Sequence, residues 1–208
     1  AATLVWTDAA QHVGFGLSRV LGGLIFSVGL ILVVLAGAEL YTGNNLMVAG
    51  ALRGHVSVGP MLLRWLVVWL ANFAGSLIVV WLVYGGGVWK LNEMAMGAAA
   101  LKIAVVKAGL PPLQAFISGI GCNWLVCLAV WMATAARQVS GKILAIVFPI
   151  TVFVAVGFEH CVANQYFLPL GMVLADNAQV VAKAHLDLSG LTWANCFINN
   201  LIPVTLGN

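Results

Sequence analysis

The sequence contains very little charge. Only 7% of its 208 residues are Asp, Glu, Lys or Arg, whereas 62% are hydrophobic. A water-soluble domain normally has about a quarter charged residues, because its surface must be compatible with water. The shortage of charge excludes an ordinary soluble protein and predicts a chain embedded in a membrane.

Several chemical signatures are also absent. The four cysteines lack the CxxC spacing of metal and redox sites, and three of them lie in apolar runs, which predicts buried, unreactive thiols. The sequence contains no Walker loop and no glycine-rich nucleotide fingerprint. The nine Lys and Arg residues form no basic run of the kind that binds nucleic acid. We therefore predict no metal, no cofactor, no catalytic residue and no nucleic-acid partner.

Long apolar runs make up most of the chain. Each is near or above the roughly 20 residues that a membrane-spanning helix needs, and none alternates as a barrel strand does. The fourth run is interrupted only by Glu159 and His160. An all-α membrane protein, folded as a helical bundle, is the prediction. The runs are 20–38, 65–89, 108–136 and 143–175.

The connections between these runs differ in charge. Loops 43–64 and 137–142 contain four basic residues and no acidic one, whereas the connections on the opposite side mix both signs. Basic residues are enriched in the short cytoplasmic loops of membrane proteins. The distribution predicts a multi-pass protein of the inner membrane with these two loops in the cytoplasm.

A pattern of small and polar residues occurs twice. It reads GAELYTGN in the first half and GFEHCVAN in the second. Each copy is followed by a second shared pattern, VWLAN ending at Asn72 and VTLGN ending at Asn208. Because both pairs keep the same order and interrupt apolar helices, we predict one transmembrane domain with two structural repeats, about 1–107 and 108–208.

The repeats predict two broken helices that enter the membrane from opposite faces. We expect the first break at residues 42–45, and the second around Asn164, Gln165, Pro169 and Gly171, because these residues continue a helix poorly. The free N–H groups at a half-helix N-terminus favour an anion.

Comparing the halves indicates six spans in a complete molecule. The comparison predicts four complete spans in this chain. Two further spans, one before Arg19 and one at the C-terminal end, are predicted to be truncated. The segment 89–107 is predicted to be an extramembrane connection with some helix, and 176–190 a polar loop.

Ionisable residues inside the apolar runs are functional candidates. His160 is the only histidine in such a run, and its charge can change near neutral pH. The alternative is a neutral imidazole that joins two helices. Glu159 must be protonated or paired, because an unpaired buried charge costs several kcal/mol. For Glu39 we expect a structural role, and for Asn123 both helix joining and pore lining stay open.

Four stretches resemble signature segments of a known family. GGLIFSVGLILVVLAGAELYTGNN, CNWLVCLAVWMA, FEHCVANQYF and NLIPVTLGN are similar to segments of the formate/nitrite transporter family, most closely its formate channel branch. The resemblance implies six-span protomers with inverted repeats and an aquaporin-like architecture, assembled as homopentamers in lipid. It also implies a passive or proton-coupled channel for formate or a similar small weak-acid anion.

The resemblance also implies roles for individual positions. It pairs Lys107 with Glu159, and it places Tyr41 where phenylalanine is common. Asn164, singled out by the repeat, is included in the site. The predicted pore residues are Thr42, His160, Asn123, Asn208, Lys107, Glu159 and Asn164. The predicted constriction residues are Phe26, Leu30, Leu40, Tyr41, Val126 and Phe153.

Energetics indicate how an anion would cross an apolar constriction. An isolated anion faces a cost on the order of 20 kcal/mol in a low-dielectric site. Protonating a carboxylate of pKa about 4 at pH 7 costs only about 4 kcal/mol. We therefore predict that Lys107 and Thr42 attract the anion, and that His160 lends it a proton.

Other functions compete with this interpretation. Nitrite or hydrosulfide is the alternative substrate within the family, and a non-conducting membrane subunit is a second alternative. A membrane enzyme could use Glu159, His160 and Cys161. Adjacent residues on one helix point about 100° apart, however, so these three side chains would not converge.

Overall fold

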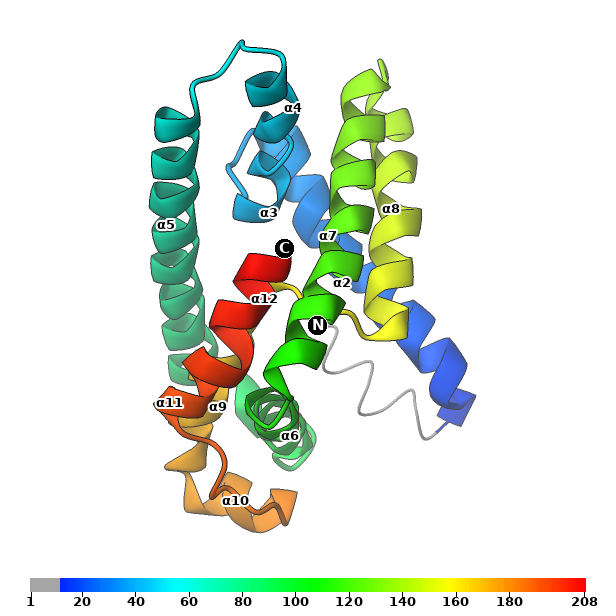
Figure 1. Ribbon diagram of the computed structural model, residues 1–208. Helices are drawn as coiled ribbons and strands as arrows, with labels where there is room; N and C mark the ends of the chain where they lie inside the picture. The colour runs from blue at the N-terminus through cyan, green and yellow to red at the C-terminus, as the bar shows by residue number, and fades with distance from the viewer. Residues whose placement is uncertain (1–11) are drawn as a thin grey trace.

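The computed structural model describes residues 12–208, and this part of the chain is helical without any strand (Figure 1). The all-helical prediction is confirmed. The elements are α2 (Phe15–Ala36), α3 (Tyr41–Asn44), α4 (Met47–Leu52), α5 (Val58–Gly85), the 3₁₀ turn η1 (Val88–Lys90), α6 (Ala95–Ala108), α7 (Pro112–Ala135), α8 (Val139–Val156), α9 (Cys161–Ala175), α10 (Ala178–Ala184), α11 (Trp193–Asn195), the π-helical turn η2 (Cys196–Leu201) and α12 (Ile202–Gly207).

Four of these helices, α2, α5, α7 and α8, are long and apolar enough to cross a membrane. Their outward faces are apolar too: on α5, Leu63 is 63% exposed and Trp81 is 71% exposed. Exposed aliphatic and aromatic side chains are stable against lipid, where no hydrophobic force drives them inward. The chain is an integral membrane protein. The incomplete span predicted before α2 falls mostly on residues 1–11, outside the described residues.

Glycines allow the spanning helices to cross closely. A Cβ atom at Gly23 of α2 would lie 2.8 Å from the Thr151 carbonyl oxygen of α8. One at Gly119 of α7 would lie 2.9 Å from the Val204 carbonyl oxygen of α12. Close backbone approach between small residues is the usual way in which helices associate in lipid.

The first helix break lies earlier than predicted. Helix α2 ends at Gly37, whose φ of 74° is in the left-handed region, and Leu40 is extended before α3 begins. The main break is therefore residues 37–40, earlier than the expected 42–45: Thr42, Gly43 and Asn44 are helical, and of the expected residues Asn45 alone lies in the turn between α3 and α4. A glycine with positive φ ends a helix more effectively than residues with merely low helix propensity.

The second break was also misplaced. Helix α8 ends at Gly157, with φ 85°, and His160 is the extended residue before α9. Asn164, Gln165, Pro169 and Gly171, which were predicted to mark the break, all lie within α9. Tertiary contacts override their weak propensity, since all four are buried.

Of two connecting segments, one contains the helix predicted for it and the other is more ordered than predicted. The expected polar loop 176–190 contains the helix α10. The expected connection 89–107 contains most of α6, where Leu101 and Ala104 are fully buried against a core that includes Leu168 of α9. Helix α6 thus contributes residues to the wall of the cavity described in the next subsection.

The two broken helices run in opposite directions. In Figure 1, α2 rises toward α3 and α4, and α5 returns downward, whereas α8 descends toward α9, and α11 and α12 return upward. This is the inverted arrangement predicted from the repeated patterns. Both breaks consequently lie near the middle of the bundle.

Candidate functional site

Two cavities meet at the second break. The first cavity, of about 580 Å³, lies between α2, α6, α8 and α9. The second cavity, of about 400 Å³, is lined by residues of α2, α6, α7, α8 and α9, together with Leu40 and His160. They approach each other at the residues that line both, which are Phe26, Phe153, His160, Ala163 and Phe167.

The cavities differ in charge. Arg19, Lys102, Lys107 and Glu159 line the first cavity, so cations outnumber carboxylates there. No Asp, Glu, Lys or Arg is among the described residues that line the second cavity. Of the predicted constriction residues, those that line the second cavity are Phe26, Leu30, Leu40, Val126 and Phe153.

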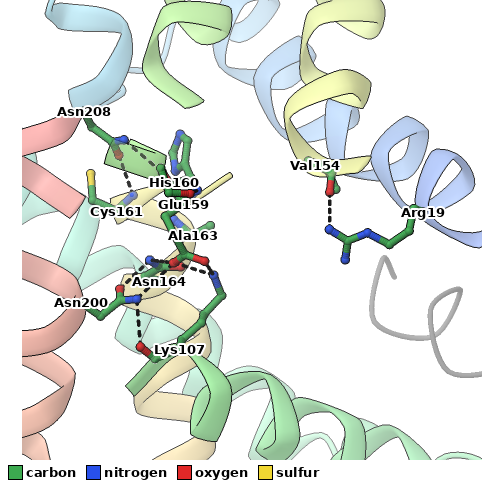
Figure 2. A network of polar contacts seen from close by, with 11 residues as sticks. Arg19, Lys107, Val154, Glu159, His160, Cys161, Ala163, Asn164, Asn200 and Asn208 are labelled. Carbon is green, nitrogen blue, oxygen red and sulfur yellow. Dashed lines mark hydrogen bonds and ion pairs between the residues drawn. The ribbon is translucent and has the colours of Figure 1, made fainter. Parts of the chain in front are cut away.

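His160 is held through both ring nitrogens. Its Nδ1 accepts a hydrogen bond from the Ala163 N–H at 3.1 Å, which caps α9 (Figure 2). Its Nε2 lies 3.1 Å from Thr42 Oγ1. Because a backbone N–H is always a donor, Nδ1 is unprotonated in this arrangement. The neutral ring therefore carries its proton on Nε2 and donates to Thr42. The ring also stacks on Phe153, with centroids 5.9 Å apart.

Glu159 has the partner that a buried carboxylate requires. Both of its oxygens lie 2.8 Å from Lys107 Nζ. Asn164 and Asn200 donate to Oε2 at 2.7 and 3.1 Å, as Figure 2 shows. Paired charges with additional hydrogen bonds offset the cost of burial. The pairing of Lys107 with Glu159 is present as the resemblance implied.

Two residues of this region were not predicted from the sequence. Asn200, on η2, accepts from Asn164 Nδ2 at 2.6 Å and donates to the Lys107 carbonyl at 3.1 Å. Arg19 donates to the Val154 and Ala155 carbonyls at 2.7 and 3.0 Å. It thereby provides hydrogen-bond donors for carbonyls that have no partner within the last turn of α8. The signal for Asn200 was the pair of amides in the apolar stretch FINNL, because polar side chains are rare in membrane segments.

The sequence repeat corresponds to a repeat of hydrogen bonds. At the second break, Asn208 accepts from Cys161 N at 2.7 Å and donates to the Glu159 carbonyl at 3.0 Å. At the first break, Asn72 makes the same two bonds, accepting from Tyr41 N at 3.0 Å and donating to the Glu39 carbonyl at 3.1 Å. Each asparagine thus joins the backbone on both sides of the extended residue.

The two glutamates of the repeat also have matching partners. Asn44 donates to Glu39 at 3.0 Å, as Asn164 donates to Glu159. Glu39 is paired with Arg64 of α5, so it has the structural contacts expected for it. The resulting bonds tie α3 and α9 each to the glutamate that lies two residues before the helix begins.

Four predicted residues line neither of the two cavities: Thr42, Tyr41, Asn123 and Asn208. Thr42 is fully buried beside His160. Tyr41 packs edge-on against Trp65, and its hydroxyl donates to the Thr205 carbonyl at 3.3 Å.

Asn123 makes contacts between helices. It donates to the Asn208 carbonyl oxygen and to Cys127 Sγ, the latter at 3.6 Å. The bond to Asn208 joins α7 to the end of α12, whereas the bond to Cys127 lies within α7. The pore role of Asn123 stays a prediction.

Known proteins are similar to this chain in sequence. The sequence matches the formate/nitrite transporter family over residues 1–208. It is 40% identical over 207 residues to a probable formate transporter of Methanothermobacter thermautotrophicus, covering 93% of this chain and 70% of that protein. It is 38% identical over 207 residues to the formate channel FocA of Escherichia coli K12, covering 97% of this chain and 73% of that protein.

Solved structures agree with the sequence comparison. A pentameric formate channel with formate bound superposes with a TM-score of 0.87 at 36% identity, over 99% of this chain and 82% of that one. An ion channel of the same family superposes with a TM-score of 0.81 at 31% identity, over 99% and 77% of the two chains. The family match over the whole chain, the sequence identities and the superpositions agree, and the chain belongs to the formate/nitrite transporter family.

Proposed function

We propose that this chain forms a formate channel in which the permeating acid passes from one cavity to the other beside His160. One observation carries the proposal: among the described residues that line both cavities, His160 is the only one that can change its charge near neutral pH. The similar proteins that are formate channels support formate as the substrate.

The first cavity favours the arrival of an anion. Lys102 and Lys107 line it together with Arg19, and its carboxylate, Glu159, is engaged by Lys107. A cleft lined mainly by one sign of charge raises the local concentration of the opposite ion. Formate is therefore drawn as the anion toward the second break.

The second cavity disfavours the anion. Its walls include the side chains of Leu30, Leu40 and Val126, which offer no hydrogen-bond donor. A bare anion between such side chains faces a cost on the order of 20 kcal/mol. Neutral formic acid, which costs about 4 kcal/mol to form at pH 7, is the species that crosses.

The proton is passed at His160. In the resting arrangement the ring is neutral, because Nδ1 accepts from Ala163 N. A second proton must bind Nδ1, where it displaces that hydrogen bond, and an anion beside the ring offsets this cost. The imidazolium then gives one proton to the carboxylate, which leaves a neutral ring and formic acid. The second proton is supplied by the solvent on the side of the first cavity, and its transfer to formate restores the neutral resting ring, so one proton moves with each formate.

The proposed channel is a homopentamer located in the inner membrane. Five copies side by side in the inner membrane, as in the pentameric formate channel, would cover part of the apolar outer surface. Helix α5 contributes to that surface with Leu66, Leu70 and Ile78, which are all at least half exposed. Each protomer then keeps its own pore, because both cavities are formed within one chain.

Flux measurements in proteoliposomes with an internal pH dye test the proposal. Wild-type protein is expected to move formate together with protons, and His160→Phe is expected to uncouple formate flux from the pH gradient. His55→Phe is the matched control, because His55 is exposed in the connection between α4 and α5.

Each outcome has a distinct meaning. Proton coupling that persists in His160→Phe would reject the role of His160 as proton donor. Wild-type protein that moves nitrite but not formate would reassign the substrate. Wild-type protein that moves neither anion would instead indicate a non-conducting subunit.

A further inference from the structure

Leu40 is the residue of the first break that reaches the permeation path. It is extended, with φ −123° and ψ 125°, between the end of α2 and the start of α3. Its side chain lines the second cavity and packs against the cluster that contains Leu30 and Val126. The width of this cavity therefore depends on the direction in which the Leu40 side chain points.

Asn72 of α5 bonds to the backbone on both sides of Leu40. Its Nδ2 donates to the Glu39 carbonyl at 3.1 Å, and its Oδ1 accepts from the Tyr41 N–H at 3.0 Å. The Glu39 carbonyl belongs to the peptide unit before Leu40, and the Tyr41 N–H belongs to the peptide unit after it. Because each peptide unit is planar, holding both units fixes φ and ψ of Leu40 and with them the direction of its side chain.

The second break provides an internal comparison. Asn208 makes the same two bonds around His160, to the Glu159 carbonyl at 3.0 Å and from the Cys161 N–H at 2.7 Å. In both breaks the residue between the two bonds is the one whose side chain lines the second cavity. In both breaks, the pair of asparagine hydrogen bonds therefore holds the residue that faces the permeating acid.

An asparagine side chain suits this position because its amide both donates and accepts. Backbone groups without partners are costly in a membrane, where lipid offers no hydrogen bond. Leucine is similar in size to asparagine but can make neither bond. Glutamine keeps both groups but displaces them by one methylene.

We propose that Asn72 is a positioning residue for the Leu40 constriction and thereby sets the largest acid that the channel passes. The inference rests on the proposed function. An apolar site discriminates against one additional methylene by roughly 10–200-fold, and only while its walls are held in place. Releasing Leu40 is therefore expected to raise the passage of acetate, which is one carbon larger than formate, relative to that of formate.

Acetate and formate fluxes in proteoliposomes test this directly. Asn72→Leu is expected to raise the acetate-to-formate flux ratio by about threefold or more, a modest part of the discrimination available to an apolar site. Leu40→Ala is expected to raise the ratio by itself. If Asn72 acts through Leu40, adding Asn72→Leu to Leu40→Ala leaves the ratio unchanged, because the two effects are then not additive.

The matched control is Asn199→Leu. Asn199 also donates to a backbone carbonyl, that of Ala108 at 3.0 Å, but it lines neither cavity. Its substitution is expected to leave the flux ratio at the wild-type value. Should Asn72→Leu fail to assemble, Asn72→Gln replaces it, with a smaller rise in the ratio expected.

The inference and the proposed function fail in different ways. Wild-type protein that conducts formate, with an unchanged acetate-to-formate ratio in the Asn72 variants, would overturn the inference alone. An equal fall of both fluxes in these variants would also overturn it, since that result indicates a purely structural residue. Wild-type protein without formate flux would overturn the proposed function itself.

Discussion

The two broken helices share one backbone plan and differ in the side chains they present. In each, a glycine with positive φ ends the first half-helix: Gly37 in one and Gly157 in the other. In each, an asparagine from another helix bonds on both sides of the extended residue. That residue is Leu40 in the first break and His160 in the second. The shared backbone geometry places one residue of each break beside the second cavity. That residue is apolar in the first break and can bind a proton in the second.

The ion pairs of the two breaks differ in burial. The side chains of Lys107 and Glu159 are 15% and 9% exposed, whereas those of Arg64 and Glu39 are 54% and 43% exposed. Water stabilises the charges of an exposed pair even when the pair is broken. Among the described residues, the buried charges contact each other, two amides and the Phe167 ring, whose centroid lies 5.9 Å from Lys107 Nζ. Equivalent substitutions in the two pairs are therefore expected to have very different consequences.

Breaking the buried pair is expected to have the largest effect. Lys107→Met removes the partner of Glu159 and leaves a buried carboxylate held only by Asn164 and Asn200. The free energy of unfolding is expected to fall by about 3–5 kcal/mol. Thermal or denaturant unfolding of the purified protein in detergent measures this loss.

The double variant Lys107→Met with Glu159→Gln provides the control for that measurement. It removes both charges together, so most of the lost stability is expected to return. A Lys107→Met variant as stable as Arg64→Met would contradict the expectation, because burial would then make no difference between the two pairs.

The next largest effect concerns the glycines that end α2 and α8. Alanine in the left-handed region costs roughly 1–2 kcal/mol. A Cβ at Gly157 would also lie 3.0 Å from Arg19 Nη2, whereas at Gly37 no other atom lies within 4 Å. Gly157→Ala is therefore expected to destabilise the protein more than Gly37→Ala, as measured by the shift in unfolding temperature. Equal shifts would show that Arg19 moves aside without cost.

The sequence predicted the repeat because the repeated residues bond to one another locally. Glu39 and Asn44 lie at the same spacing as Glu159 and Asn164, and each pair forms one hydrogen bond across the start of a short helix. The recurrence of an asparagine at positions 72 and 208 likewise indicated a shared role. The sequence alone could not predict that these asparagines bond to the backbone of the breaks, because Asn72 and Glu39 are far apart along the chain and only the fold brings them together.

The positions of the breaks could not be predicted from residue propensity. The chain has 23 glycines, so the presence of glycine does not reveal which residues adopt a positive φ. Asn164 was assigned to the second break, yet it is held within α9 by bonds to Glu159 and Asn200. Asn200 itself was missed because its partner, the Lys107 carbonyl, is 93 residues away in the sequence.

The smallest effect is expected at the exposed pair. Arg64→Met removes the guanidinium that donates to Glu39, but Glu39 keeps its bond from Asn44 at 3.0 Å and stays accessible to water. The loss of stability is expected to be below about 1 kcal/mol, as for other exposed pairs. It is also expected to disappear in about 1 M salt, where the Debye length falls to roughly 3 Å. Unfolding at low and high salt, for wild type and Arg64→Met, measures both; a loss that persists at high salt would indicate that packing of the Arg64 side chain, rather than its charge, stabilises the first break.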